Sequence, residues 1–389
     1  AAGTSLQRRT TGNVWTNVLN SKTYDIAFEP GDPSIVYVLI KNAALNLCEF
    51  WKSTDGGLTF SIRSSGWITA LTDSGGRLTV TPADNNRIYA ALLTGDGPRI
   101  MRSDDAGETW TIIASSNFTG LIGPCNTGAL SMTNGQGFFD LSIVASQTNA
   151  DQIIVGTTTS FKSTDGGVSY APMGGYCGPF STHPDFQEMV AKGSDTWIVT
   201  DGGINLSDDF YTDPTVGLHY FVRTNNLHGS EHWGFDCGWN EDVMVGGRYH
   251  DGNMAWRETY PAGDFLRMGG GEAATGYVNP GNNSMAYFSD LGGIGKILPL
   301  NNNQPVLNFT VTKSPNESFY PMEGAEQKWD PRYMYTFYLG NGNQFWKTID
   351  NGLTFTALFT HSNATAEIRY VEVSRSNPDV IYFTAYVDS

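Results

Sequence analysis

The sequence predicts an all-β protein, and more narrowly a single β-propeller of eight four-stranded blades, with seven blades as the alternative. Three observations predict this class: a turn motif with four copies, a hairpin pattern with five copies, and a period of about 49 residues. The composition agrees. The 389 residues include 45 Gly and 13% aromatic residues but only 16% charged residues, below the usual quarter.

The turn motif has the pattern Ser/Thr-x-Asp-x-Gly-x-Thr/Ser-aromatic, and is called the repeated turn below. Its copies span Lys52–Phe60, Arg102–Trp110, Lys162–Tyr170 and Lys347–Phe355. The Asp can accept N–H groups across the turn, the Gly tolerates positive φ, and the aromatic residue is expected between sheets. We assign a structural role in these turns to Ser53, Asp55, Gly57, Ser103, Asp105, Gly107, Ser163, Asp165, Gly167, Asp350 and Gly352.

The second repeated pattern is a strand, a turn rich in Pro, Asn and Asp, and a strand of β-branched and aromatic residues. Its copies lie at residues 28–38, 80–90, 144–156, 278–288 and 373–383. We expect this pattern to form the first hairpin of a blade, and the repeated turn to join the third and fourth strands.

The spacing of the repeated turns sets the predicted blade number. Asp55 and Asp105 are 50 residues apart, Asp105 and Asp165 are 60 apart, and Asp165 and Asp350 are 185 apart, which leaves room for three degenerate blades. Half-blades at both ends predict a closing blade, which removes the exposed sheet edge. The predicted blades are 20–68, 69–117, 118–174, 175–226, 227–264, 265–315 and 316–361, closed by 362–389 together with 1–19.

The repeated turn is similar to the Asp-box of sialidases, xyloglucanases and sortilin-like receptors. The whole chain resembles the Asp-box (BNR) propellers of secreted Bacteroidetes proteins, which are labelled sialidase or glycosyl hydrolase by similarity. The resemblance rests on Tyr24–Val38 leading to KSTDGG, on HPDFQ (183–187) followed by VTDGGI, and on GGRYHDGN (246–253) followed by GGGE. It implies type IX secretion, a secreted or cell-surface location, and a place in a larger surface protein.

The charge narrows the range of partners. With 23 basic and 39 acidic residues, the formal net charge is −16, which disfavours binding to nucleic acid or to an anionic membrane. No apolar run reaches 18 residues, so no membrane insertion is expected. The expected partner is a glycan or a protein ligand.

Two enzyme classes can be tested against the residues. The Arg-Ile-Pro motif that the resemblance to sialidases requires is missing, because Arg87 precedes Ile88-Tyr89 and Arg99 precedes Ile100-Met101. Xyloglucanases use a cleft between two propellers, and only one is expected here. Any other glycosidase still needs two carboxyl groups beside a cleft.

The predicted site lies in the degenerate blades, between residues 183 and 272, where the repeated turn is lost while polar and glycine-rich loops remain. Catalytic candidates are Asp185, Asp251 and Glu272. Ligand-binding candidates are His183, Arg248, His250, Arg267, Trp233 and Trp256. The alternative for each is a hydrogen-bonded turn or a core position.

We therefore predict a binding or adhesion module for glycans or a protein partner, with a glycoside hydrolase as the alternative and a structural surface domain as a third reading. No cofactor or zinc site is expected, although the acidic loop 207–214 has the oxygen ligands that calcium prefers. Among the four cysteines (Cys48, Cys125, Cys177 and Cys237), a Cys125–Cys177 disulfide and buried thiols are alternatives.

Overall fold

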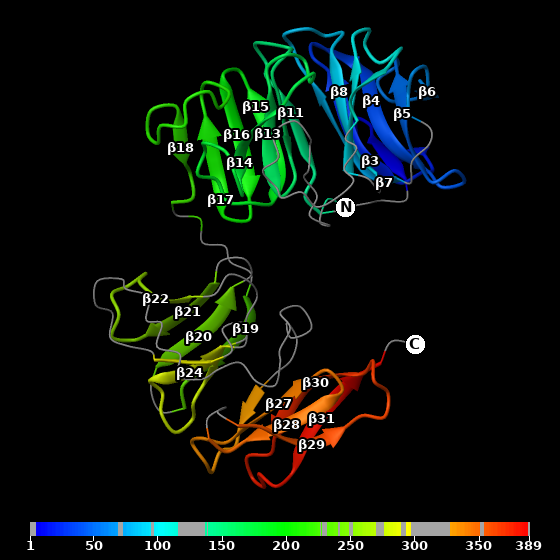
Figure 1. Cartoon of the computed structure of the whole chain (residues 1–389). Helices are drawn as coiled ribbons and strands as arrows, with labels where there is room; N and C mark the ends of the chain where they lie inside the picture. Colours follow the sequence, from blue (N-terminus) through cyan, green and yellow to red (C-terminus); the bar gives the residue numbers. More distant parts are fainter. Residues whose placement is uncertain are drawn as a thin grey trace. The chain divides into compact units, whose positions relative to one another are not determined.

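The protein is all-β, as the sequence predicts: strands and turns account for its regular structure, and the described residues contain no helix (Figure 1). The computed structural model describes residues 5–68, 73–94, 97–115, 137, 139–225, 227, 232–239, 242–248, 252–269, 276–288, 293–296, 327–350 and 354–387. Within these ranges, no segment forms a helix able to cross a membrane. The chain divides into two compact units, unit 1 (residues 1–227) and unit 2 (residues 228–389).

Unit 1 contains a two-stranded hairpin and four four-stranded antiparallel sheets, in which strands adjacent in sequence are adjacent in space. The hairpin is β1 (Leu6–Arg9) and β2 (Trp15–Leu19). The sheets are β3 (Thr23–Glu29), β4 (Asp32–Asn42), β5 (Leu47–Ser53) and β6 (Ser61–Ile62); β7 (Asp73–Val80), β8 (Ile88–Thr94), β9 (Gly97–Ser103) and β10 (Thr111–Ser115); β11 (Ser142–Ala145), β12 (Ile153–Gly156), β13 (Thr159–Ser163) and β14 (Ala171–Gly175); and β15 (Phe186–Lys192), β16 (Asp195–Thr200), β17 (Gly203–Ser207) and β18 (Tyr220–Val222).

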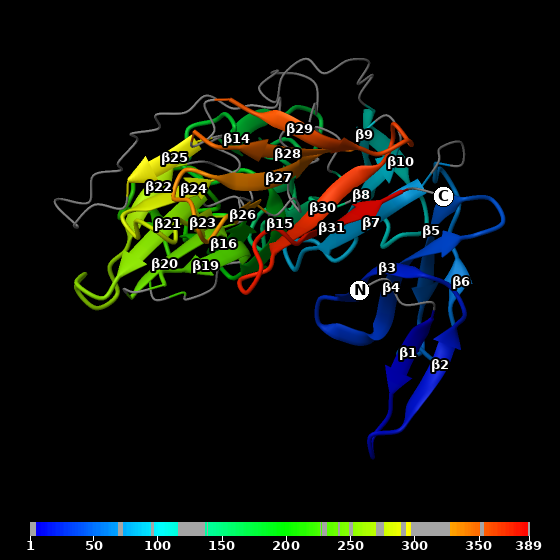
Figure 2. The same cartoon turned by 90° about the horizontal axis from the view of Figure 1, so that it is seen from below.

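Unit 2 follows the same order of strands (Figure 2). Its sheets are β19 (His232–Cys237), β20 (Val243–Arg248), β21 (Gly252–Arg257) and β22 (Leu266–Gly269); β23 (Gly276–Val278), β24 (Met285–Phe288) and β25 (Gly293–Lys296); β26 (Gln327–Trp329), β27 (Phe337–Asn341), β28 (Gln344–Thr348) and β29 (Thr356–Thr360); and β30 (Glu367–Val373) with β31 (Ile381–Tyr386).

The five predicted first hairpins are β3–β4, β7–β8, β11–β12, β23–β24 and β30–β31, each at the residues that the pattern marks. One border differs from the prediction, because β22 lies beyond residue 264, after the turn that follows β21. The single ring, its number of blades and the closing blade of 362–389 with 1–19 remain predictions.

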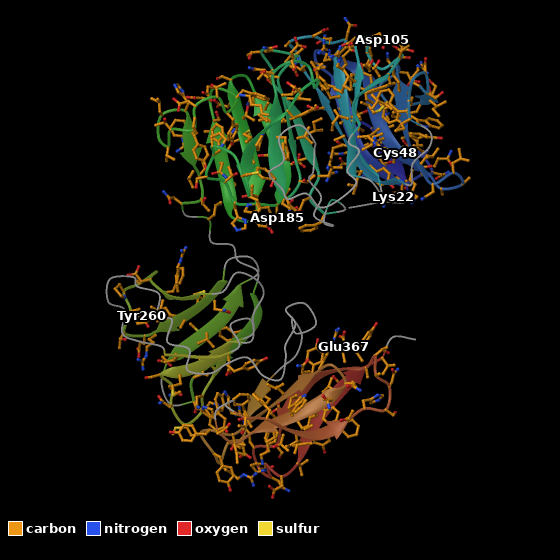
Figure 3. The ribbon with its side chains drawn as sticks, in the orientation of Figure 1. Lys22, Cys48, Asp105, Asp185, Tyr260 and Glu367 are labelled. Carbon is orange, nitrogen blue, oxygen red and sulfur yellow. The ribbon has the colours of Figure 1, made fainter. Side chains whose placement is uncertain are left out.

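The alternating strand direction gives each sheet two edges. The entry edge holds the start of the first strand and the turn between the second and third strands. The turn edge holds the first hairpin turn and the repeated turn. Figure 3 shows this division in unit 1, where Asp105 and Asp185 lie at opposite edges.

The cores lie between neighbouring sheets and are rich in aromatic rings. Trp110, the aromatic residue of the second repeated turn, is 4% exposed. Its ring packs edge-on against Phe50, with centroids 4.7 Å apart, and against Trp67, at 4.8 Å. Edge-to-face pairs of this kind add to the free energy gained by burying the rings. The predicted burial of this aromatic residue between sheets is confirmed.

The repeated turns form the hydrogen bonds expected from their sequence. The Ser53 hydroxyl donates to Asp55 Oδ1 (2.7 Å) and accepts the Gly57 N–H (2.9 Å). Asp55 also accepts the backbone N–H and the hydroxyl of Thr59, at 2.9 and 2.6 Å. Equivalent Asp–Ser/Thr bonds occur at Asp105, Asp165 and Asp350. In the third turn, donation from Ser169 lowers the pKa of Asp165 to about 2.

A fourth turn of unit 1 keeps this geometry without glycine. Ser207 Oγ accepts the N–H of Tyr211 (2.9 Å), and Asp209 accepts the N–H of Thr212 (3.1 Å). Tyr211 has φ of +56° where the other turns have Gly, a conformation that L-residues rarely adopt. Burial offsets this strain, because the Tyr211 ring packs against Phe180 with centroids 5.1 Å apart.

Each of the four turns of unit 1 is joined to the preceding sheet or hairpin by one basic side chain. The donor is a Lys or Arg on the preceding sheet, and in three of the four pairs it directly precedes the Ser that begins its own sheet's turn. The acceptor is a carbonyl oxygen of the next sheet's turn, in the residue three positions after the Ser of that turn. The β1–β2 hairpin supplies the first such residue. The pairs are Arg8 Nε to Gly56 (2.8 Å), Lys52 Nζ to Ala106 (2.9 Å), Arg102 Nη1 to Gly166 (3.1 Å) and Lys162 Nζ to Phe210 (2.9 Å).

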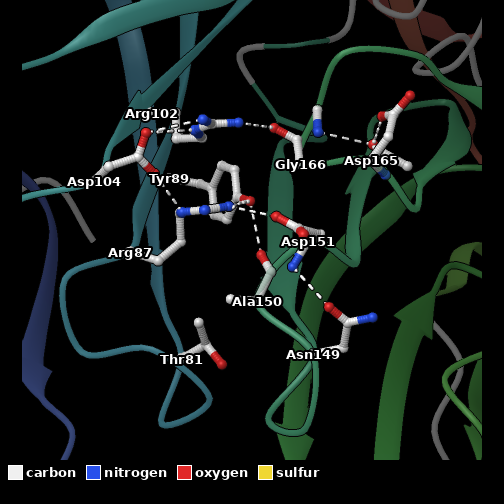
Figure 4. Close-up of polar contacts among 12 residues, drawn as sticks. Thr81, Arg87, Tyr89, Arg102, Asp104, Asn149, Ala150, Asp151, Asp165 and Gly166 are labelled. Carbon is white, nitrogen blue, oxygen red and sulfur yellow. Dashed lines mark hydrogen bonds and ion pairs between the residues drawn. The ribbon is translucent and has the colours of Figure 1, made fainter.

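Figure 4 shows one of these junctions, between the β7–β10 and β11–β14 sheets. Besides the Arg102 bond, Arg87 Nη1 lies 2.8 Å from Asp151 Oδ1, and its Nε lies 2.6 Å from Asp104 Oδ1. The Tyr89 hydroxyl donates to the Ala150 carbonyl oxygen (2.7 Å). The Arg87–Asp151 ion pair and the two hydrogen bonds to carbonyl oxygens therefore cross from one sheet to the next, and Asp104 holds Arg87 from within its own sheet.

Replacing Asp105 by Ala should lower the free energy of unfolding by about 1–2 kcal/mol, because the turn loses its acceptor for Thr109 and Ser103. Urea unfolding measures the change, with Glu258→Ala as an exposed control carboxylate. An unchanged midpoint for Asp105→Ala would contradict this role of the turn, and ligand binding should not change.

Two glycines of equivalent turns should respond differently to Ala. Both have positive φ, +79° at Gly57 and +84° at Gly107, so both variants strain the backbone. A Cβ at Gly107 would also lie 2.7 Å from the Phe50 ring, whereas at Gly57 the nearest atom is at 3.6 Å. We expect a loss of about 1 kcal/mol for Gly57→Ala and about 1–3 kcal/mol more for Gly107→Ala. Equal unfolding midpoints for the two variants would refute the steric argument.

Candidate functional site

Four first strands carry an aspartate within the strand or just before it: Asp25, Asp140, Asp185 and Asp236. Asp140 is fully buried and Asp185 is 5% exposed. Burial raises the pKa of Asp25, Asp140 and Asp236, because the charged carboxylate loses water.

Asp25 and Asp236 connect neighbouring sheets. Asp25 Oδ2 accepts the N–H of Leu78 on β7 (2.7 Å), and Asp236 Oδ2 accepts the N–H of Val278 on β23 (2.8 Å). In each unit, therefore, an aspartate on one first strand binds the backbone of the next first strand. This arrangement explains why a carboxylate is retained at a half-buried position.

Asp140 and Asp185 form a different arrangement, in which two carboxyl groups meet. They are hydrogen-bonded to each other, which requires that one of them carries a proton. Burial, followed by the negative charges of Asp185 and Asp201, raises the pKa of Asp140 to about 7. The pair therefore keeps a proton to a pH well above that at which an ordinary aspartate loses it.

Gln187 connects this pair to Asp201. Its Nε2 donates to Asp140 Oδ1 (2.8 Å) and to Asp201 Oδ1 (3.0 Å), so these two oxygen atoms are at most 5.8 Å apart. Asp185 lies just before β15 with φ of +67°, and its N–H donates to the Thr158 carbonyl (3.3 Å). The cluster lies at the entry edge of unit 1, where β11 and β15 start and β16 turns into β17.

The geometry favours positioning over direct catalysis for the buried pair. Glycosidase carboxyl groups stand about 5–5.5 Å or 6.5–9.5 Å apart, on either side of the sugar. Asp140 and Asp185 are in hydrogen-bond contact and buried, so no sugar ring fits between them. Gln187 and Asp201 are partly exposed, and the pair fixes their positions.

The predicted site residues fall into three groups. His183 and Asp185 lie together at the entry edge, with the His183 ring 3.1 Å (Nδ1) from the Pro184 carbonyl oxygen. Arg267 is exposed on β22, while Trp256 packs against the core of unit 2. For Arg248 and Trp233, only the backbone is described, in β20 and β19 respectively. The remaining candidates lie outside the described residues, as does one residue of the fourth repeated turn: His250, Asp251, Glu272 and Gly352.

Sequence reasoning missed Asp140 and Gln187 as members of the cluster. A signal for Asp140 exists, because an Asp follows an aromatic residue or proline within or just before four first strands: YDIAF, FDLSI, PDFQE and FDCGW. Gln187 ends the HPDFQ segment noted above, but its role as a bridge depends on the spacing between two sheets.

A depression lined by β3, β7, β11 and β15 adjoins the cluster's strands in unit 1, with Asp25, Arg77 and Glu188 among its lining residues. Two of these side chains are hydrogen-bonded to the backbone. Arg77 donates to the carbonyl oxygens of Leu141 (3.0 Å) and Tyr24 (3.3 Å), and Asp25 accepts the N–H of Leu78. Their polar atoms therefore hold strands together.

Metal binding finds little support in the described ranges, where no three His, Cys, Asp or Glu residues form a metal-binding group. On the loop considered for calcium, Asp208 pairs with His219 (2.8 Å), and Asp209 accepts bonds from its own turn. Cys125 lies outside the described residues, so the Cys125–Cys177 disulfide remains a prediction.

No protein-family profile and no curated protein sequence matches the chain, but solved structures resemble it. The GH74 enzyme of Niastella koreensis superposes with a TM-score of 0.51 at 15% identity, over 92% of this chain and 61% of that one. The GH74 xyloglucanase of Xanthomonas campestris gives 0.39 at 13% identity, over 98% and 64%. YCF48 from Cyanidioschyzon merolae gives 0.27 at 13% identity, over 91% and 90%.

The Niastella enzyme supports the β-propeller class, and at this identity the likeness concerns the fold alone. The chain spans about three fifths of that enzyme's length. Membership of the Asp-box group of type IX secretion proteins remains a prediction.

The raised pKa of Asp140 predicts how stability depends on pH. The folded state keeps a proton that the unfolded chain releases above its ordinary pKa of 3.8, so this group's contribution falls as pH rises from about 4 to about 7. Asp140→Asn should flatten the melting temperature over this range, because the amide cannot ionise. Asp195→Asn, at the other edge of the β15–β18 sheet, is the control. Parallel pH curves for Asp140→Asn and the wild type would contradict the shared proton.

Proposed function

We propose that this chain is a carbohydrate-binding β-propeller, and that its glycan contacts the entry edge of unit 1 at His183, Gln187 and Asp201. The observation that carries the proposal is the buried Asp140–Asp185 pair beneath a partly exposed amide and carboxylate. Because both N–H groups of the Gln187 amide are already donated, its carbonyl oxygen and the Asp201 carboxylate are the groups that can accept hydrogen bonds from adjacent sugar hydroxyls. The pair fixes Gln187 in advance, so less conformational entropy is lost when a ligand binds.

Two further points support a glycan. The edge offers polar hydrogen-bonding groups in the partly exposed side chains of His183, Gln187 and Asp201. The fold is also shared with a GH74 enzyme, so this architecture is compatible with carbohydrate chemistry. A secreted or cell-surface location, an adhesive role and a place in a larger surface protein belong to the same proposal.

Glycoside hydrolysis is the second candidate, and the raised pKa of Asp140 is the observation that favours it. A general acid needs a pKa near the working pH. Asp140 is fully buried, however, and does not itself reach a sugar. Hydrolysis would therefore need carboxyl groups other than Asp140, and the sequence-predicted candidates for that role are Asp251 and Glu272, which lie outside the described residues.

A glycan array followed by titration calorimetry tests the binding proposal. We expect Asp201→Ala to weaken binding at least tenfold, because a carboxylate that binds sugar hydroxyls is lost. Asp195→Ala is the matched control, since Asp195 lies on the same sheet at the turn edge, and it should bind as the wild type does.

The same oligosaccharides, analysed for cleavage products, separate the two candidates. Retention without product supports binding. Product that disappears in Asp251→Asn or Glu272→Gln would establish hydrolysis instead. If the array retains no glycan, or if Asp201→Ala binds unchanged, the proposed function is wrong.

A further inference from the structure

Unit 2 has a pocket of its own, on the first strands of its sheets and independent of the site proposed in unit 1. Its lining includes Asp236 of β19, Trp239, Lys328 and Trp329 of β26, Glu372 of β30, and Arg375. It is called the Trp239 pocket here. The lining residues that follow the first strands, Trp239 and Arg375, place it at the turn edge.

The polar groups of the Trp239 pocket differ in how far they are already bonded. Asp236 Oδ2 accepts the Val278 N–H (2.8 Å), and Lys328 Nζ pairs with Glu372 at 3.4 Å. Both carboxylates therefore have partners. Arg375 has no salt bridge among the described residues, although its positive charge faces Asp236 across the pocket.

The aromatic groups add a second kind of contact. The Arg375 guanidinium lies over the Trp239 ring, 4.8 Å from its centroid, and Trp239 is 48% exposed. Stacking on an indole leaves the edge of the guanidinium, with its N–H donors, available to an anion. The Trp329 indole N–H has no acceptor among the described residues, and Trp329 is only 8% exposed.

We propose that the Trp239 pocket binds a uronic acid residue of an acidic polysaccharide. Arg375 pairs with the sugar carboxylate, because a planar guanidinium binds a carboxylate through two parallel hydrogen bonds. Lys328 offsets the charge of Glu372, with which it is paired, and Trp239 contacts the apolar face of the sugar ring. A chain of net charge −16 repels polyanions in general, so this pocket is where an acidic chain would be held.

Arg223 provides a matched control. It lies over the Phe221 ring at the same distance, 4.8 Å, and is exposed, but it is in unit 1 and outside the pocket. Arg223→Gln and Arg375→Gln therefore remove the same group from the same kind of aromatic contact. Only Arg375→Gln should affect binding of a uronate.

The test is titration of the full chain with oligogalacturonate and with a neutral oligosaccharide of equal length, followed by calorimetry and tryptophan fluorescence. We expect saturable binding of the oligogalacturonate, weakened by added salt. Arg375→Gln and Trp239→Ala should each lose at least tenfold in affinity, Arg375→Lys should recover part of the loss, and Arg223→Gln should bind as the wild type does.

Three results would overturn the proposal: no binding of the oligogalacturonate, binding of the neutral oligosaccharide that Arg375→Gln weakens to the same extent, or an Arg375→Gln variant that binds the oligogalacturonate as tightly as the wild type. Melting temperatures of the variants show whether a loss reflects misfolding. Asp201→Ala in unit 1 should leave uronate binding unchanged, so failure of this proposal and failure of the function proposed for unit 1 can be told apart.

Discussion

The hydrogen bond from a basic side chain to the next turn's carbonyl oxygen is the contact on which the order of unit 1 depends. It recurs from Arg8 to Gly56, from Lys52 to Ala106, from Arg102 to Gly166 and from Lys162 to Phe210. A charged donor to a carbonyl oxygen is stronger than a neutral one, and it fixes direction as well as distance. Each sheet is thereby tied to its successor at the turn edge.

The conformation of the turns makes this contact possible. The hydroxyl and carboxylate at the start of each turn accept backbone N–H groups of the same turn. The acceptor carbonyl belongs to the residue three positions after the Ser, and this residue has a positive φ in all four turns: Gly56, Ala106, Gly166 and Phe210. The last case shows that glycine is not essential. Where Phe210 and Tyr211 occupy the strained positions, aromatic packing around Tyr211 compensates.

A second set of contacts runs along the first strands, where buried aspartates bind the backbone or side chains of the next sheet. Asp25 and Asp236 each accept a backbone N–H of the next first strand, and Asp25 also accepts the N–H of Ile26. Asp140 instead meets Asp185, and the two must share a proton. The same pair affects both the stability of the fold and the geometry of the site, because the carboxyl groups that share the proton also hold Gln187 beside Asp201.

The sequence by itself determined the all-β class, the places of the repeated turns and the five first hairpins, because these follow from residues within about ten positions of one another. Asp55, Gly57 and Thr59 specify their turn without help from the rest of the chain. It also pointed to His183 and Asp185. Only the tertiary structure decided that Asp140 meets Asp185, that Gln187 bridges to Asp201, and that Arg375 lies over Trp239. These contacts join residues far apart in the chain, and their energies depend on burial and on the spacing between sheets, which no local pattern records.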